Sequence, residues 1–294
     1  MSNNLSSLTL SCIGAGRLGK TLCHLFSQHL HIGQIINRSE YSAKSAVDFI
    51  GAGQAQTVPV EQADIWLIAT PDDEIKTASA ALRDSGVLRS GDTVFHCSGV
   101  LNASMLDLNG CQTASVHPIH SFADPRQSIN QFAGTPCGME GDSHSIELLQ
   151  AVFQQVKATP FIIDSQHKAL YHAATVMTCN YLVSLLELGQ QMLAASGVNQ
   201  HTVSSPLEPL IRQTLDNYFK TDAISALTGP IARGDAATVA SHIQALRQQP
   251  NNWRQVYSAL GNTTRLIAEK QGQASLENLT AIDALLNAGA EPHD

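Results

Sequence analysis

Three glycines near the N-terminus have the spacing of a loop that binds a dinucleotide. The loop comprises Gly14, Ala15, Gly16, Arg17, Leu18 and Gly19. It follows an apolar run at residues 8–13 and opens a helical pattern. In that context the first glycine permits a tight turn, the second lets the backbone approach a pyrophosphate, and the third lets the helix pack on the strand. N–H groups at the helix start would hold the phosphates. A glycine-rich turn without a ligand is the alternative.

The residues after the second predicted strand indicate which nicotinamide cofactor is bound. An NAD enzyme usually has Asp or Glu there, to bind the ribose 2′-hydroxyl. This chain has Asn37, Arg38 and Ser39. Arginine can pair with a 2′-phosphate that a carboxylate would repel, and its two neighbours can donate hydrogen bonds. We therefore predict NADP(H), with NAD(H) less favoured; a solvated Arg38 at a poorly discriminating site is the alternative. The predicted cofactor site also includes Ala69, Thr70 and Pro71.

Polar residues end two further predicted strands and could take part in proton transfer. His117 follows one strand and Ser98 follows the strand before it. Because open α/β sheets bind ligands at the carboxyl ends of their strands, both are predicted to reach the same crevice. His117 could exchange a proton with a substrate there. Alternatively, His117 and Pro118 shape a turn. We interpret His96 and His120 as structural.

Two kinds of periodicity divide the chain. Short apolar runs predict strands at residues 8–13, 33–37, 65–69, 93–97, 113–116 and 161–163, with helices at 18–31 and 42–50 and another opening at 72–74. Later segments predict only helices, at residues 167–196, 209–219, 236–247 and 253–271 and after 275. The predicted fold class is α/β: a Rossmann-type, mostly parallel sheet domain at residues 1–164, then an all-α domain at residues 165–294.

Composition excludes several classes of protein. The formal net charge of −8 disfavours nucleic-acid binding, because such proteins present basic surfaces. The N-terminal segment lacks the features of a signal peptide, and no uninterrupted apolar stretch is long enough for a membrane span, so we expect a cytoplasmic protein. The 6 cysteines are scattered without a C-x-x-C pair. This spacing favours free thiols over a disulfide scaffold, and no metal site is predicted.

Several segments together resemble one bacterial family. They are the glycine loop and residues 64–75, 96–99, 115–118, 121–122, 167–174 and 229–235. The chain is similar to proteins that couple a Rossmann-like domain to a helical domain of unknown function, within the β-hydroxyacid dehydrogenase and pyrroline-5-carboxylate reductase superfamily. The resemblance implies an NADP-linked oxidoreductase fold and a homodimer built through the helical domains. It supplies no substrate.

The resemblance also implies an acid/base pair on the long helix. β-Hydroxyacid dehydrogenases place a lysine near the start of this helix, and Lys168 stands in the matching place. His172, four residues on, replaces their usual asparagine, and it shares a helix face with Lys168 and Thr175. We expect this face to point into the cleft beside the nicotinamide, with either residue as the acid/base. A solvated polar face is the alternative.

One arginine could recognise a substrate carboxylate. Arg233 is the cation of the turn at residues 229–235, and its planar fork suits a carboxylate. The alternative is a capping or dimer-contact residue beside Asp235.

Three functions fit these residues. The first is an NADP(H)-dependent reductase or dehydrogenase of a small carbonyl, hydroxy-acid or imine substrate. The second is a non-catalytic NADP(H)-binding sensor or regulator. The third is a prephenate-dehydrogenase-like enzyme in which His117 binds the substrate hydroxyl. A long helix followed by others with little charge further predicts a homodimer through residues after about 165.

Overall fold

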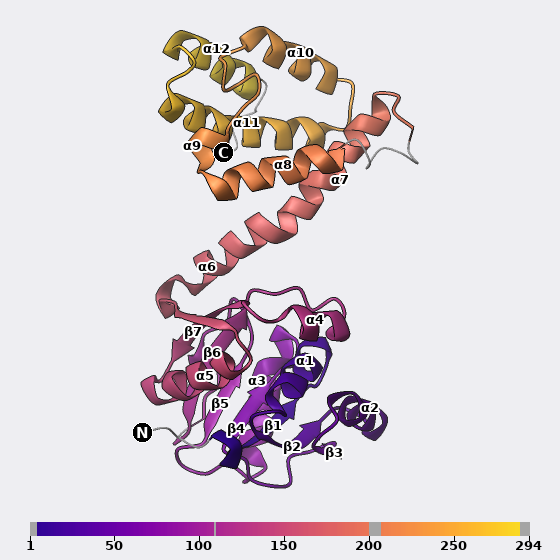
Figure 1. The fold of residues 1–294 in the computed structure, drawn as a ribbon, viewed down its shortest axis with the longest axis vertical. Coiled ribbons are helices and arrows are strands. Elements are labelled where there is room, and N and C mark those ends of the chain that lie inside the picture. The colour runs from indigo at the N-terminus through magenta and orange to yellow at the C-terminus, as the bar shows by residue number, and fades with distance from the viewer. Residues whose placement is uncertain (1–4, 109, 200–206, 289–294) are drawn as a thin grey trace. The chain divides into compact units, whose positions relative to one another are not determined.

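The chain folds into two compact units. The computed structural model describes residues 5–108, 110–199 and 207–288, and contacts divide the chain into residues 1–181 and 182–294 (Figure 1). The domain boundary predicted between residues 164 and 165 falls just after β8, the last strand, which ends at Ile162. The division by contacts, between residues 181 and 182, lies later in the chain, within a long helix. Each unit is described here by itself.

The first unit is built on one mostly parallel sheet. Its described strands lie in the order β3-β2-β1-β4-β5-β6-β7-β8, and only the β6–β7 pair is antiparallel. The strands are β1 (Thr9–Ile13), β2 (His31–Ile36), β3 (Gln54–Gln56), β4 (Ile65–Ile68), β5 (Thr93–His96), β6 (Gln112–Pro118), β7 (Pro136–Gly141) and β8 (Thr159–Ile162). The predicted Rossmann-type α/β fold class is confirmed.

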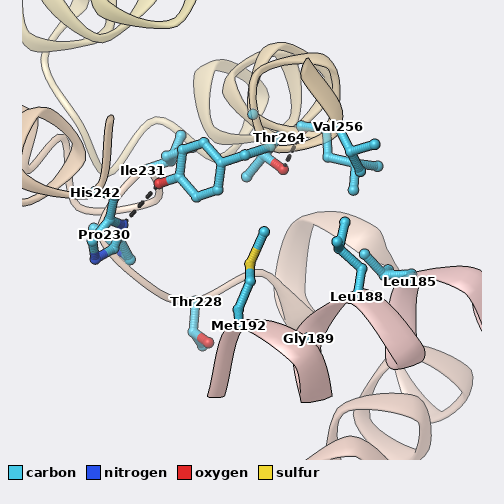
Figure 2. Close-up of a pocket in the computed structure, with 13 residues that line it drawn as sticks. Leu185, Leu188, Gly189, Met192, Thr228, Pro230, Ile231, His242, Val256 and Thr264 are labelled. Atoms are coloured by element: carbon cyan, nitrogen blue, oxygen red, sulfur yellow. Dashed lines mark hydrogen bonds between the residues drawn. The ribbon is translucent and has the colours of Figure 1, made fainter. Parts of the chain in front are cut away.

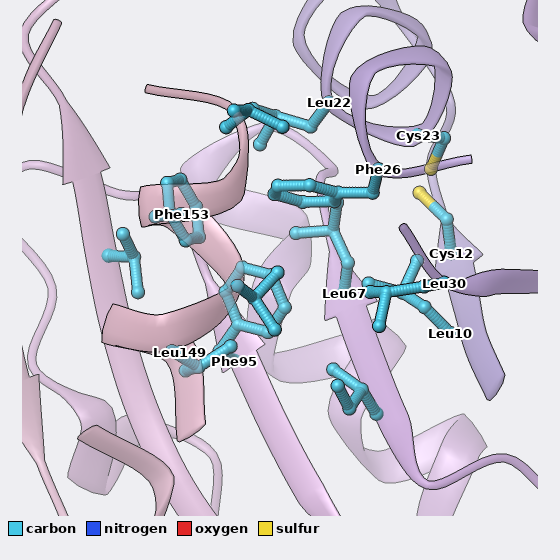
Figure 3. Packing of buried hydrophobic residues seen from close by; sticks show 14 of the residues in the cluster. Leu10, Cys12, Leu22, Cys23, Phe26, Leu30, Leu67, Phe95, Leu149 and Phe153 are labelled. Atoms are coloured by element: carbon cyan, nitrogen blue, oxygen red, sulfur yellow. The ribbon is translucent and has the colours of Figure 1, made fainter. Parts of the chain in front are cut away.

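Helices cover both faces of this sheet. The helices that pack on its strands are α1 (Arg17–Phe26), α2 (Glu40–Ile50), α3 (Ile75–Asp84) and α5 (Ser143–Gln155). Of the other two helices, α4 (Pro125–Gln131) packs against α1, and α6 (Lys168–Thr175) follows β8. Successive strand residues point to opposite faces, so Leu67 joins the core under α1 and α5 whereas Trp66 joins the core under α3. Figure 3 shows the first of these cores, where Phe26 and Phe153 meet edge to face at 5.1 Å.

Two sequence predictions about this unit need correction. The helix predicted at residues 18–31 ends at Phe26, because His31 already pairs with β1 as the first residue of β2. The strands β3 and β7 were not predicted. β7 reads PCGMEG, whose proline and glycines obscure the strand pattern, and it is stabilised by pairing on both sides.

A long apolar helix runs from the first unit into the second. After α6, a π-helical turn (Val176–Asn180) leads into α7 (Tyr181–Ala195), as the pattern at residues 167–196 predicts. Residues 165–195 have a mean hydropathy of 1.2 in their most apolar window, so by length and composition alone this helix could cross a membrane. No residue of α7 is buried.

The second unit is helical in its described part. Besides α7 it contains α8 (Leu207–Lys220), α9 (Ala223–Ala226), α10 (Ala236–Leu246), α11 (Asn251–Gln271) and α12 (Leu276–Asn287). Its buried core lies among α10, α11 and α12. A hollow of about 340 Å³ separates α7 from α11, and Leu188 and Met192 face it from α7 (Figure 2). Two hydrogen bonds lie at its wall: His242 Nδ1 contacts the Tyr257 hydroxyl at 2.8 Å, and Thr264 Oγ1 donates to Leu260 O at 2.8 Å.

Candidate functional site

The glycine loop joins the carboxyl end of β1 to α1. Gly14 has φ +87°, and a Cβ there would lie 2.7 Å from Thr70 Cγ2, so only glycine fits without strain. A Cβ at Gly19 would lie 3.2 Å from Ala69 Cβ, which keeps α1 close to the sheet. Gly16 differs, because its Cβ would meet only Gly14 O, at 4.0 Å. The surface over Gly16 is therefore open for a ligand.

The start of α1 offers unused hydrogen-bond donors over that opening. Gly16 occupies the N-cap position and no side chain caps the helix. The first intrahelical bond runs from Lys20 N–H to Gly16 O at 2.9 Å. The N–H groups of Arg17, Leu18 and Gly19 therefore have no acceptor within the helix. Such a terminus fits the pyrophosphate of a dinucleotide, because the helix dipole also favours an anion there.

The residues that follow β2 hold this loop in place and supply a positively charged side chain. Asn37 Oδ1 accepts the Ala15 N–H at 2.8 Å while its amide donates to Ser42 O at 3.0 Å, so Asn37 positions the loop as well as lining it. Ser39 caps α2 by accepting the Ser42 N–H. Arg38 is exposed and has no ion-pair partner among the described residues. A phosphate beside the α2 terminus could bind Arg38 without displacing another anion.

Lys168 and His172 do not form one open face, contrary to expectation. The Lys168 side chain is 1 % exposed, and its ammonium donates to Leu101 O, Ser115 Oγ and Glu140 Oε1, the last at 2.9 Å. Burial lowers the pKa of Lys168, while the adjoining Glu140 carboxylate opposes that shift. All three ammonium donors are used. Lys168 thus ties α6 to β6, β7 and the loop after β5.

His172 turns instead to a histidine cluster at the carboxyl end of β6. A Cβ at Gly99 would lie 2.3 Å from His172 Nδ1 and 3.0 Å from His117 Nε2, so this glycine makes room for both rings. The two imidazoles stand 5.5 Å apart. His117 Nδ1 contacts the Tyr171 hydroxyl at 2.9 Å. His172 Nδ1 is buried with no hydrogen-bond partner among the residues described.

His117 is the member of this cluster suited to meet a substrate. Burial, with the adjacent His172 and Lys168, lowers the pKa of His117 to about 4, so the ring is neutral at pH 7. Its Nδ1 is held by Tyr171, and its Nε2 has no partner within the described ranges. Because β1, β4, β5 and β6 are parallel, this nitrogen lies at the sheet edge that carries the glycine loop.

Ser98 holds the loop beneath this cluster. Its hydroxyl donates to Asp72 Oδ2 at 2.7 Å and accepts the N–H groups of Val100 and Leu101. Ser98 N–H in turn donates to His96 Nδ1, and His96 Nε2 contacts Asn102 O. His96 is completely buried, which agrees with its interpretation as structural.

Comparisons with known proteins agree with this architecture. Residues 3–118 match the model of a Rossmann-like domain, and residues 135–264 match a domain of unknown function, DUF2520. Together the matches take in most of the chain. The chain thus combines a Rossmann-like domain with a DUF2520 domain. No curated protein matches its sequence significantly.

Solved structures share the fold of this Rossmann–DUF2520 protein. Protein TM1727 from Thermotoga maritima is 26 % identical, with a TM-score of 0.71 over 90 % of this chain and 99 % of its own. BF3122 from Bacteroides fragilis, named as a candidate NADP oxidoreductase, is 20 % identical with the same TM-score and coverage. A pyrroline-5-carboxylate reductase from Coxiella burnetii is 12 % identical, with a TM-score of 0.56 over 97 % of each chain. These likenesses show that the chain shares the fold of these proteins.

The remaining predicted site residue lies in the second unit. Arg233 is exposed, and no ion-pair partner of its guanidinium occurs in the described part of the chain. The cap of α10 is Asp235, whose carboxylate accepts the Thr238 N–H at 3.0 Å. Arg233 helps to lower the pKa of that carboxyl, after the hydrogen bonds from Thr238. Asp235 therefore caps α10, and Arg233 does not.

Sequence reasoning missed four residues of the Rossmann–DUF2520 site. They are Asp72, Gly99, Glu140 and Tyr171. Tyr171 lies beside His172 in the sequence, so a tyrosine next to a candidate base was an available signal. Glu140 left no such signal, because it lies on the unpredicted strand β7. In the described ranges no group of three His, Cys, Asp or Glu side chains could hold a metal ion.

Proposed function

We propose that this protein is an NADP(H)-dependent oxidoreductase acting on a small carbonyl, hydroxy-acid or imine substrate. One observation carries the proposal: the neutral His117, whose Nε2 has no partner among the described residues, lies at the same sheet edge as an open glycine loop. Ligands of open α/β sheets bind at this edge, next to the point where the strand order reverses. Here that point lies between β1 and β4.

The proposed roles follow from these contacts. The glycine loop and the α1 N–H groups bind the pyrophosphate, and Arg38 with Ser39 binds the 2′-phosphate of NADP(H). The cofactor supplies or takes up a hydride when bound. His117 Nε2 hydrogen-bonds the substrate at the reacting centre, and the neutral ring can accept a proton from a hydroxyl there. Tyr171 holds His117 Nδ1, and Lys168 acts as a positioning residue.

Replacing His117 tests this proposal. His117→Gln should lower turnover of a hydroxyl substrate by about 10² or more, the usual scale for a positioned acid/base group, while NADPH affinity stays within about twofold. The matched control is His144→Gln, at an exposed histidine at the start of α5. Unchanged turnover in His117→Gln would contradict the assignment. Tight NADPH binding without turnover across a broad panel of carbonyl and imine compounds would favour the sensor instead.

We further propose that the protein is a cytoplasmic homodimer assembled through the helical unit. None of the described residues of α7 or α8 is buried, and Val183, Leu210 and Phe219 are each more than half exposed. Apolar surface of this extent favours association. A second copy is the occupant we choose over a bilayer, because α7 carries the charged Glu187 near its middle.

A further inference from the structure

One carboxylate stands beside the proposed substrate position. Asp72 opens the 3₁₀ turn η2 (Asp72–Glu74) that follows β4. Its Oδ2 accepts the Ser98 hydroxyl at 2.7 Å, and Ser98 adjoins Gly99, against which both cluster histidines pack. The Asp72 side chain is exposed, and its Oδ1 has no hydrogen-bond partner in the described part of the chain. This oxygen is available to a ligand.

The charges around this position do not cancel. Besides His172, the ionisable groups that act on His117 are Lys168 and Asp72. Lys168 lowers the pKa of His117 more strongly than Asp72 raises it, but the lysine is buried and paired with Glu140. Asp72 has no cationic partner among the described residues. Because Lys168 is buried and Asp72 is exposed, the charged group that a ligand can reach beside Ser98 and Gly99 is the Asp72 carboxylate.

We infer that the substrate reduced at this site is a cationic imine, an iminium ion, whose nitrogen is held by the Asp72 carboxylate. The inference rests on the proposed function and narrows its substrate class. An oxo acid or hydroxy acid would bring a second negative charge towards Asp72, and like charges repel. A protonated imine brings the opposite charge and an N–H that the carboxylate can accept.

The chemistry of such a substrate suits the groups present. The iminium carbon accepts a hydride, with its electron pair, from NADPH. The C=N π pair moves to nitrogen, which already carries its proton, and a neutral amine and NADP⁺ result. No proton donor is needed in this step. A ketone would instead leave an alkoxide that must be protonated, whereas neighbouring charge and burial keep His117 neutral at pH 7.

Matched probes test the inference on the full-length protein. 1-Pyrroline and the permanently charged N-methylpyrrolinium ion supply the cation, cyclopentanone supplies a neutral ring of the same size, and 2-oxobutanoate supplies an anion. We expect kcat/KM for the two imine probes to exceed that for the other two by at least about tenfold. Asp72→Asn should lower it by about tenfold for the imines only. The Kd of pyrrolidinium, the protonated form of the product amine, measured by calorimetry with NADP⁺ bound, should rise by a similar factor in Asp72→Asn.

Two control variants separate charge from structure. Asp73→Asn removes the same charge from the next residue of η2, and it should leave all four probes unaffected. Ser98→Ala removes the hydrogen bond to Asp72 but keeps the carboxylate, so it should preserve the preference for imines. The inference would be overturned if kcat/KM were higher for 2-oxobutanoate or cyclopentanone than for the imines, or if Asp72→Asn lowered kcat/KM equally for all probes. Either result would leave the oxidoreductase proposal intact. NADPH binding with no reduction of any probe would overturn both.

Discussion

The Lys168 ammonium lies 2.9 Å from the Glu140 carboxylate, and both side chains are almost completely buried. The pair joins the first turn of α6 to β7, and Glu140 Oε1 also accepts the Ala103 N–H at 2.8 Å. A buried ion pair gives little net stability, since desolvation offsets the attraction. The pair does fix the position of α6 relative to β7, because separating the two groups would leave a buried charge without a partner. Lys168 therefore holds the helix that presents Tyr171 and His172.

Replacing Lys168 alone should destabilise the protein more than replacing both Lys168 and Glu140. Lys168→Met leaves the Glu140 carboxylate buried and unpaired, so we expect a loss of about 3–5 kcal/mol in the free energy of unfolding. The double variant Lys168→Met/Glu140→Gln should recover part of this loss, because glutamine can still accept the Ala103 N–H. Urea unfolding measures both. A double variant no more stable than Lys168→Met would contradict the explanation.

Local pattern predicted much of this fold, and long-range pairing accounts for most of the rest. The apolar run before Gly14 forms β1, and the segment at residues 167–196 is helical over nearly its whole length, as their patterns predict. The sequence pattern correctly predicted that Lys168 and His172 lie on one helix. It did not predict which residues surround their side chains. Lys168 is buried by Glu140 on β7, a strand that is formed by pairing with β6 and β8. Such partners are set by tertiary contacts that a single sequence does not display.

His96 should make the protein less stable in mild acid. Burial lowers the pKa of His96 to about 4, from about 6.5 in the unfolded chain. Between those values the unfolded chain binds a proton that the folded state does not, so the free energy of unfolding falls as the pH drops through this window. For His96 the full effect is about 3 kcal/mol. His117, whose pKa is also lowered to about 4, acts in the same direction.

The measurement is urea unfolding at pH 7 and at pH 5. His96→Gln should make the difference between the two free energies smaller than in the unmodified protein, whatever its effect on absolute stability. His144→Gln, at an exposed site, should leave the difference unchanged. The same difference in all three proteins would show that His96 titrates normally.

Cofactor preference should depend on Arg38. We expect NADPH to bind at least tenfold more tightly than NADH, a difference of about 1.4 kcal/mol. Arg38→Ala should erase most of this preference while sparing NADH, because only the 2′-phosphate distinguishes the two. Arg17→Ala, at the exposed start of α1 beside the proposed pyrophosphate site, should weaken the binding of both cofactors alike. Equal affinities of the unmodified protein for NADPH and NADH would contradict the assignment.

The apolar surface of α7 should be covered by a second copy of the chain. At micromolar concentration, light scattering should give about twice the monomer mass of 31.4 kDa. Val183 is 68 % exposed on α7, so Val183→Asp should put a charge into the interface and weaken association by at least about tenfold. Val58→Asp makes the same change at a valine 57 % exposed in the first unit, and it should leave the dimer intact. A monomeric mass for the unmodified protein, or equal effects of the two substitutions, would place the contact elsewhere. Association with phospholipid vesicles instead of self-association would indicate that a bilayer covers α7.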